Sequence, residues 1–414
     1  MNASHNPVKR VSSLLAVVLA AALVFGTAAS ARHDADPGVG PDSILIGGSV
    51  PLSGLASGYA SVAKGAAAYF AYVNDHGGVN GRKIQYKYLD DAYDPTQTVQ
   101  ATRQLVEQDR VFAVFNTLGT EDNIAIRDYL KQRGVPQLFV ASGAQTWGRD
   151  YKQYPTAIGY LPSYVAEGTI YGRYIAAHWK TAKIGILYQN DAYTQDLING
   201  LKKALGGKAS LIKAKQGYDV TSSGVSSQIA ALKGAKVDTV LIFATPVFTI
   251  QAYVAMNKLG WKPKHVIVNQ VSSAASTMQI SEANAKPQVE GSYSTVVFKD
   301  PDDPSQRSAA GVKLYYSIMA KYAKSDNPHD AYNVYAMAVA YTFVDALKHA
   351  GKSPTRQSMM NAVLHLREAA NPFLLKGVVV STTPADHFPI KQARLEQWRG
   401  GRWHWVGPLV SARG

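Results

Sequence analysis

Two short polar stretches contain the residues of this chain best suited to bind a small anion. The first, residues 116–120, follows the apolar run 111–115 and precedes a helical pattern that begins at Glu121. The second, residues 141–144, follows another apolar run, 136–140. Hydroxyls, backbone amides and a helix N-terminus that meet at the ends of neighbouring parallel strands favour an anion without any metal or cysteine. The sequence therefore predicts an anion-binding site at the carboxyl edge of a parallel sheet.

This prediction depends on two hydroxyl residues, Thr120 and Ser142. We expect Thr120 to be the N-cap of its helix, because its hydroxyl could accept from an unpaired amide of the first turn. Capping alone would also explain Thr120, and loop polarity alone would explain Ser142. Ala141 and Gly143 favour the binding interpretation, because small residues let a ligand approach the backbone closely.

Strands and helices alternate on both sides of these two stretches. Before residue 160 we expect strands at 44–48, 83–89, 111–115 and 136–140, and helices at 59–73, at 94–108 and from 121 onward. Asp94 followed by Pro95 is typical of a capped helix start, and Asn80-Gly81 is typical of a tight turn. The alternation predicts a doubly wound parallel sheet, which places the protein in the α/β class.

The same alternation begins again after residue 160 and predicts a second lobe. Expected helices are 163–179, 195–205, 225–232 and 248–259, and expected strands are 183–188, 210–213, 239–243, 265–268 and 291–298. Beyond residue 300 the pattern changes to helices at 308–324, 331–350 and 354–364, followed by a strand at 377–380 and a hairpin over 392–405 that turns at Gly400-Gly401. The pattern leaves open which lobe these last helices cover.

The N-terminus has the pattern of a secretory signal peptide. Lys9-Arg10 is the positive region, residues 11–25 are the apolar region, and the small residues around Ala31 form a cleavage site. The apolar run is short for a membrane span. The chain has no cysteine, so it lacks both the residue to which a lipid anchor attaches and any disulfide. We expect an exported protein, cleaved near Ala31 and free in the periplasm.

The remaining composition excludes several functions. The net charge is +14, but the basic residues are spread along the chain without a Lys/Arg block, which argues against nucleic-acid binding. Asp90, Asp91 and Asp94 are too few and too irregular for a calcium loop, and the histidines show no metal-binding spacing. No G-x-S-x-G elbow and no complete phosphate loop occur. The sequence thus predicts neither an enzyme nor a metal or cofactor site.

Several motifs together resemble one family. They are Pro51-Leu52-Ser53-Gly54 followed by Tyr59, Asn74-Asp75-His76-Gly77-Gly78-Val79-Asn80-Gly81-Arg82, Asp90-Asp91-Ala92-Tyr93-Asp94-Pro95, Leu118-Gly119-Thr120, Val140-Ala141-Ser142-Gly143-Ala144, and Asn190-Asp191-Ala192-Tyr193. The chain resembles the type I periplasmic binding proteins of the branched-chain amino-acid (Leu/Ile/Val-binding) group, which are the solute receptors of ABC importers. The likeness covers essentially all of the chain after the leader.

The resemblance implies a receptor that closes two lobes on its solute like a hinge. Lobe 1 would comprise residues 42–160 and 300–380, and lobe 2 residues 161–299 and 381–412. The implied partners are a small amino acid or organic acid and an ABC permease at the inner membrane, and the receptor would be a monomer. The implied ligand-binding residues, which hold a carboxylate or cover the ligand, are Tyr59, Thr120, Ala141, Ser142, Gly143, Tyr193, Thr245, Gln270 and Tyr335.

Gln270 is a departure from the amino-acid-binding relatives, which place a glutamate of the second lobe against the ligand ammonium. A buried cation without a counter-charge costs several kcal/mol, whereas a neutral amide suits a neutral partner. We therefore expect that the solute need not be an α-amino acid and can be an aromatic or aliphatic carboxylate. Glu121 could supply the missing charge, but as an acid in a first helical turn it is expected to face solvent.

Alternative interpretations remain for the site and for the function. Gln270 could be a turn residue at a strand end, and Tyr335 lies in an apolar helical pattern where core packing would account for it. The chain could also be a periplasmic ligand-sensing domain that signals instead of feeding a transporter. A chain that ends at Gly414 without a signalling domain favours the receptor.

Overall fold

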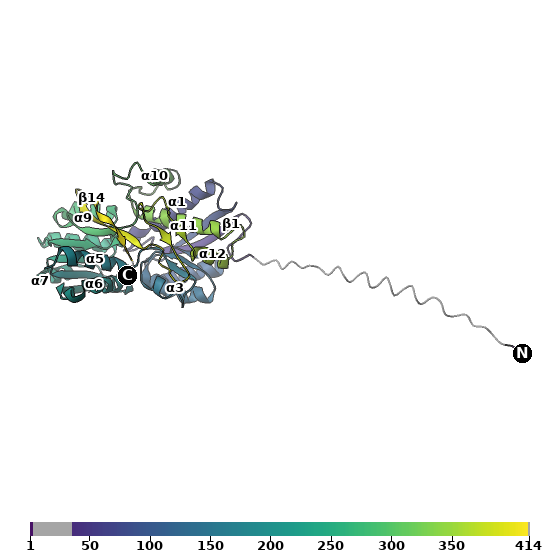
Figure 1. The fold of residues 1–414 in the computed structure, drawn as a ribbon, viewed down its shortest axis with the longest axis horizontal. Helices are drawn as coiled ribbons and strands as arrows, with labels where there is room; N and C mark the ends of the chain where they lie inside the picture. Colours follow the sequence, from purple (N-terminus) through teal and green to yellow (C-terminus); the bar gives the residue numbers. More distant parts are fainter. Residues whose placement is uncertain (3–34, 413–414) are drawn as a thin grey trace. The chain divides into compact units, whose positions relative to one another are not determined.

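The computed structural model describes residues 1–2 and 35–412, and the chain from Asp36 onward forms one compact unit (Figure 1). The expected signal peptide therefore lies outside the described residues except for Met1 and Asn2. No helix in the described ranges combines the length and the hydropathy that a membrane span requires.

The first sheet is parallel throughout and has the order β2-β1-β3-β4-β5. Its strands are β1 (Ser43–Val50), β2 (Lys83–Asp90), β3 (Val114–Phe115), β4 (Gln137–Val140) and β5 (Ala157–Gly159). The apolar run 111–115 was expected to be a strand, but only its last two residues pair. Before them, the Phe112 amide donates to the Leu45 carbonyl of β1, whereas the Val111 amide donates to the Leu105 carbonyl outside the sheet.

The second sheet has the order β14-β13-β10-β9-β8-β6-β7. Its strands are β6 (Ile184–Gln189), β7 (Ile212–Tyr218), β8 (Thr239–Phe243), β9 (His265–Val268), β10 (Tyr293–Val296), β13 (Gln392–Arg399) and β14 (Arg402–Ser411). β13 and β14 add an antiparallel edge to an otherwise parallel sheet. They are joined at Gly400-Gly401, as the sequence predicts. A separate antiparallel pair is formed by β11 (Arg367–Glu368) and β12 (Val380–Ser381).

Helices lie against both sheets. They are α1 (Ser61–Asp75), α2 (Pro95–Arg103), α3 (Thr120–Gln132), α4 (Thr146–Arg149), α5 (Tyr164–His178), α6 (Ala192–Leu205), α7 (Ser226–Gly234), α8 (Pro246–Lys258), α9 (Ala275–Val289), α10 (Ala310–Tyr322), α11 (Tyr332–His349) and α12 (Arg356–Val363). Short 3₁₀ turns are η1 (Ser57–Tyr59), η3 (Gly206–Leu211) and η4 (Gln270–Ser272), and η2 (Gln104–Gln108) is a π turn. Figure 1 shows α1, α11 and α12 together over the first sheet, and α5 beside α6 over the second.

Two helix starts show how local sequence positions the site. Asp94 caps α2 as predicted, because its carboxylate accepts from the amides of Thr96 (2.7 Å) and Gln97 (3.4 Å). The N-cap expected at Thr120 is wrong. The N-cap of α3 is Gly119, whose φ of 107° suits glycine, and no side chain caps this helix.

The packing of α5 on α6 depends on two glycines. A Cβ on Gly168 would lie 2.0 Å from the Leu197 carbonyl oxygen, and a Cβ on Gly200 would lie 2.0 Å from the Val165 carbonyl oxygen. Only glycine at these positions lets the two helix backbones touch. The contact brings the first turns of the helices together, and both first turns carry tyrosines of the site.

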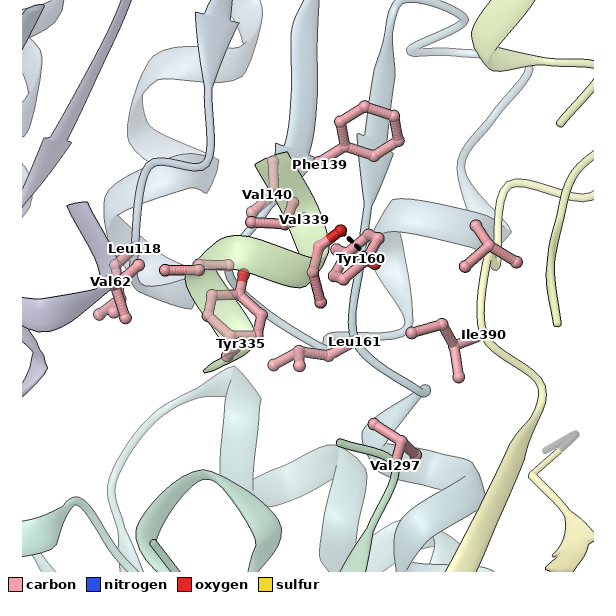
Figure 2. Packing of buried hydrophobic residues seen from close by; sticks show 14 of the residues in the cluster. Val62, Leu118, Phe139, Val140, Tyr160, Leu161, Val297, Tyr335, Val339 and Ile390 are labelled. Carbon is pink, nitrogen blue, oxygen red and sulfur yellow. Dashed lines mark hydrogen bonds between the residues drawn. The ribbon is translucent and has the colours of Figure 1, made fainter. Parts of the chain in front are cut away.

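The larger core joins the first sheet to α1 and α11. In Figure 2 the fully buried Phe139 and Tyr160 pack near Val339 of α11, and the Tyr160 hydroxyl donates to the Ala338 carbonyl at 3.0 Å. A second core lies around β8, α8 and the tryptophans of the β13–β14 hairpin. α11 therefore runs directly behind the strand ends of the first sheet, which places its N-terminal turn at the site.

Candidate functional site

A cavity lies where the loops after the first-sheet strands face those after the second-sheet strands. From the first sheet, Thr120 follows β3, Ala141 follows β4 and Leu161 follows β5. From the second, Thr245 follows β8 and Gln270 follows β9. The cavity has a volume of about 120 Å³. Ligands of open α/β sheets bind outside the carboxyl ends of the strands, which is where this cavity lies.

Most of the lining is aromatic or aliphatic. It consists of Tyr59, Val62, Tyr93, Leu118, Gly119, Thr120, Ala141, Leu161, Tyr164, Tyr193, Thr245, Gln270, Val271, Ser273, Ala274, Ala275, Thr295, Val296, Phe298, Lys299, Asp300, Ala331, Tyr332, Tyr335, Glu396 and Trp403. Of the predicted site residues, Ser142 and Gly143 are absent from this lining. The structure brings the other seven together around one space.

Two helix N-termini reach the cavity. The first residue of α3, Thr120, and the N-cap of α8, Thr245, both line it, and neither helix has a side-chain cap. The α6 N-terminus differs, because Asp191 accepts from the Thr194 amide and Glu121 accepts from the Ala192 amide at 2.9 Å. The helix dipole favours an anion at both termini, although the Thr245 amide donates to the Tyr218 hydroxyl at 3.2 Å and Pro246, the first residue of α8, has no N–H. Glu121 does not face solvent as expected but bonds across to α6.

Thr120 is held by Ser142. The two hydroxyl oxygens are 2.7 Å apart, both residues are buried, and Ser142 Oγ also accepts from the Ala144 amide. The Ala141 amide, predicted to face a carboxylate, donates to the Thr117 carbonyl at 3.0 Å. Thr120 therefore offers its side chain and helix terminus to the cavity, while Ala141 contributes only lining surface and Ser142 orients Thr120 from behind.

Gly143 lies beneath Tyr164 of α5. Its carbonyl accepts from the Tyr164 amide at 2.7 Å. Burial raises the pKa of the Tyr164 phenol, and hydrogen bonds from the Gly143 backbone and the Ser142 side chain act in the opposite direction. The Tyr164 phenol thus stands between these two predicted residues and the cavity. Its ring lies 5.0 Å from that of Tyr193.

Tyr59 and Tyr332 connect the two sides of the cavity. Their hydroxyls donate to the same acceptor, the Val271 carbonyl of η4, at 2.9 Å and 2.8 Å. Their rings meet edge-on with centroids 5.1 Å apart. Burial raises the pKa of both phenols, so both are neutral donors. Tyr332 was not predicted as a site residue from the sequence. The one feature that could have indicated it is its position on the same helix as Tyr335.

Tyr193 is fixed on the second-sheet side of the cavity. Its hydroxyl donates to the Ala244 carbonyl at 3.1 Å and accepts from Asn269 Nδ2 at 2.6 Å. On the other side, Tyr335 donates to Asn116 Oδ1 at 2.6 Å. Figure 2 shows Tyr335 between Leu118 and Leu161. Tyr335 therefore packs in the hydrophobic core and also lines the cavity.

Gln270 is anchored by a buried acid. Its backbone amide donates to Glu167 Oε1 at 2.7 Å, and the Tyr171 hydroxyl donates to the same oxygen at 2.7 Å. Burial raises the pKa of Glu167 to about 7. The Gln270 side-chain nitrogen is buried and has no hydrogen-bond partner in the described part of the chain. Gln270 therefore adds an unpaired neutral donor to the site.

Three charged residues at the cavity were not predicted. Lys299 and Asp300 follow β10, and Glu396 lies on β13. Burial raises the pKa of Asp300 to about 6 and that of Glu396 well above its ordinary value. These three residues line the cavity because β10 and β13 are neighbours in the second sheet, and no local sequence motif predicts that pairing. Within residues 1–2 and 35–412, no group of three or more acidic or histidine side chains could hold a metal ion.

The chain matches a family model described as periplasmic binding protein over residues 43–402. It is 26% identical over 361 residues to the Leu/Ile/Val-binding protein homolog 1 of Brucella suis, covering 82% of this chain and 85% of the relative.

Two solved structures share the fold. One is a branched-chain amino-acid ABC transporter protein from Thermus thermophilus with bound valine, with a TM-score of 0.77 and 16% identity over 89% of this chain and 96% of that one. The other is a fatty acid ABC transporter substrate-binding protein from Thermomonospora curvata, with a TM-score of 0.75 and 20% identity over 91% of this chain and 94% of that one.

Proposed function

Because this chain belongs to the periplasmic binding proteins, within the type I group of branched-chain amino-acid receptors, we propose that it delivers a carboxylate-bearing solute to an ABC importer. Membership implies a periplasmic location and a small-molecule solute, and the chain is a binding protein and not an enzyme. Two points are proposed: that the solute carries a carboxylate, and that the closed, loaded protein delivers it to an importer.

The acid group of the solute would bind at the α3 and α8 N-termini. Thr120 supplies a hydroxyl and the N-terminus of α3, and Thr245 supplies the N-terminus of α8 from the second sheet. Hydrogen bonds from such groups to a carboxylate are charge-assisted and stronger than neutral ones. This pair of uncapped helix termini at one apolar cavity is the observation that carries the proposal.

The rest of the lining favours a hydrocarbon or aromatic body. Six tyrosines, Phe298 and Trp403 surround the space, and the unpaired donor at Gln270 suits a neutral or anionic acceptor better than an ammonium group. The name of the Thermomonospora neighbour describes a fatty acid carrier, so this fold can accommodate acids that lack an amino group. We infer an aromatic or aliphatic carboxylate in preference to an α-amino acid.

Closure of the two predicted lobes would bury the solute. Contacts between elements of the two sheets support this mechanism: Tyr59 and Tyr332 bond to Val271, and the Gln145 amide donates to Asp196 Oδ2 at 2.7 Å. A solute that touches both sides adds contacts only in the closed state, so it shifts the equilibrium toward closure. The lobe boundaries, the monomeric state and the permease partner remain part of this proposal.

Calorimetry with leucine, valine and a panel of aromatic and aliphatic acids tests the solute class. We expect an acid of the panel to bind more tightly than either amino acid. Sub-micromolar leucine binding with no response to the acids would overturn the inferred class. Capture of the loaded protein by vesicles that contain the cognate permease, with release of solute inside, separates transport from the signalling alternative.

A further inference from the structure

The cavity has an acidic end formed by Asp300 and Glu396. These are the two acidic residues among those that line the cavity. Glu396 faces Ser294 in the β13–β10 pairing, and Asp300 follows β10 after a short connection. Only 4% of Glu396 is exposed. The two acids thus come from β13 and the loop after β10, whereas the helices that would hold the carboxylate follow β3 and β8.

No basic group neutralises this end. Within the described chain, neither acid has an ion pair within 4.0 Å, and Glu396 has no side-chain hydrogen-bond partner. The nearby Lys299 directs its ammonium group to the carbonyl oxygens of Pro372 (2.6 Å) and Leu374 (2.5 Å). The Asp300 carboxylate accepts from the Asp302 amide at 2.9 Å, and the Asp300 carbonyl accepts from the Asp303 amide.

An unpaired carboxyl this deeply buried is unfavourable unless a partner arrives with the ligand. Burying an ionised group without compensation costs several kcal/mol, so burial raises the pKa of Glu396 and favours its neutral form, whereas a bound cation would favour the ionised form. Glu368 shows the ordinary arrangement in this protein, since it is also buried but accepts from Thr342 (3.0 Å) and Asn371 (2.8 Å). Glu396 has no comparable partner, and it lines the cavity.

We propose that Glu396, with Asp300, binds a protonated nitrogen of the solute, separated from the carboxylate by several bonds. This inference rests on the proposed function and narrows its solute class to acids with a distal amino or amidine group. It is compatible with Gln270, because the cation would lie at the acidic end and not beside the carboxylate.

Calorimetry with two matched series tests the proposal on the whole exported chain. One series is β-alanine, γ-aminobutyrate, δ-aminovalerate and ε-aminocaproate; the other is propionate, butyrate, valerate and caproate, which lack the amino group. At least one amino acid should bind about tenfold more tightly than its parent acid, as expected for a charge-assisted bond. Because the spacing of the two groups is varied, the test does not depend on one assumed length.

Variants assign the preference to the acidic end. Glu396→Gln keeps the shape and should reduce the preference to about threefold or less, and Asp300→Asn should lower it as well. The control Glu368→Gln changes another buried glutamate away from the cavity and should leave it intact. Thermal unfolding confirms that each variant is folded.

Two results overturn the inference while leaving the proposed function in place. They are equal binding of both series by the unmodified protein, and a preference that survives in both Glu396→Gln and Asp300→Asn. If no carboxylate of either series or of the aromatic panel binds, the proposed function itself fails, and the inference fails with it.

Discussion

Replacing Thr120 with valine should weaken solute binding while the protein stays folded. Valine keeps the β-branched shape of threonine, so the substitution removes the hydroxyl without opening a cavity. In the structure that hydroxyl is buried, lies at the start of α3 and lines the cavity, with Ser142 Oγ 2.7 Å away. The variant therefore tests one hydrogen bond to the solute carboxylate.

The size of the effect follows from the two bonds that Thr120 can make. A charge-assisted bond to a carboxylate contributes about 1–3 kcal/mol, so the affinity should fall about 5- to 150-fold. Loss of the neutral bond to Ser142 should lower the free energy of unfolding by only about 0.5–1.5 kcal/mol. That loss is small because Ser142 Oγ keeps the Ala144 amide as a partner at 3.1 Å.

The assay is isothermal calorimetry with the tightest-binding acid of the panel, together with urea unfolding of the unliganded protein. Thr98→Val is the matched control, because Thr98 is a buried threonine bonded to Asp122 at 3.0 Å and does not line the cavity. The control should lose stability but not affinity. If Thr120→Val binds within about twofold of the unmodified protein, Thr120 does not contact the carboxylate and the reasoning is refuted.

Three further predictions address closure, pH dependence and folding. Tyr59→Phe and Tyr332→Phe should each destabilise the closed state by about 0.5–1.5 kcal/mol. The double variant should destabilise it by more than the sum, because the Val271 carbonyl then loses both donors. Solution scattering with and without solute measures closure, and strictly additive effects would contradict the shared acceptor. Burial raises the pKa of Asp122 to about 7, so its contribution to stability is present below its ordinary pKa of 3.8 and is lost as the pH rises toward 7. Asp122→Asn should therefore flatten the fall in thermal stability between these two pH values. An unchanged pH profile of the melting temperature would exclude Asp122 as the cause. Asp94→Ala should lower the free energy of unfolding by about 0.5–2 kcal/mol in urea without changing solute affinity, and a change in affinity would show that α2 acts on the site.

Features whose hydrogen-bonding partners lie close in sequence could be predicted. Asp94 caps the amides two and three residues ahead of it, and the β13–β14 hairpin turns at the two adjacent glycines that mark it. The alternation of strands and helices also follows from patterns within about fifteen residues. Thr120 shows where prediction from local sequence fails. The local rule predicts a helix cap, but the hydroxyl bonds to Ser142 at the end of the neighbouring strand.

The sequence alone determined the α/β class, the two successive windings and the strand ends that carry Thr120 and Ala141, because the periodicity of apolar residues and the turn residues are local properties. Only the tertiary structure decided which side chains share the cavity. Tyr59 meets Val271 across 212 positions of sequence, and Glu396 reaches the cavity because β13 pairs with β10. Such contacts depend on how the chain returns between its two sheets, and no short-range pattern encodes that return.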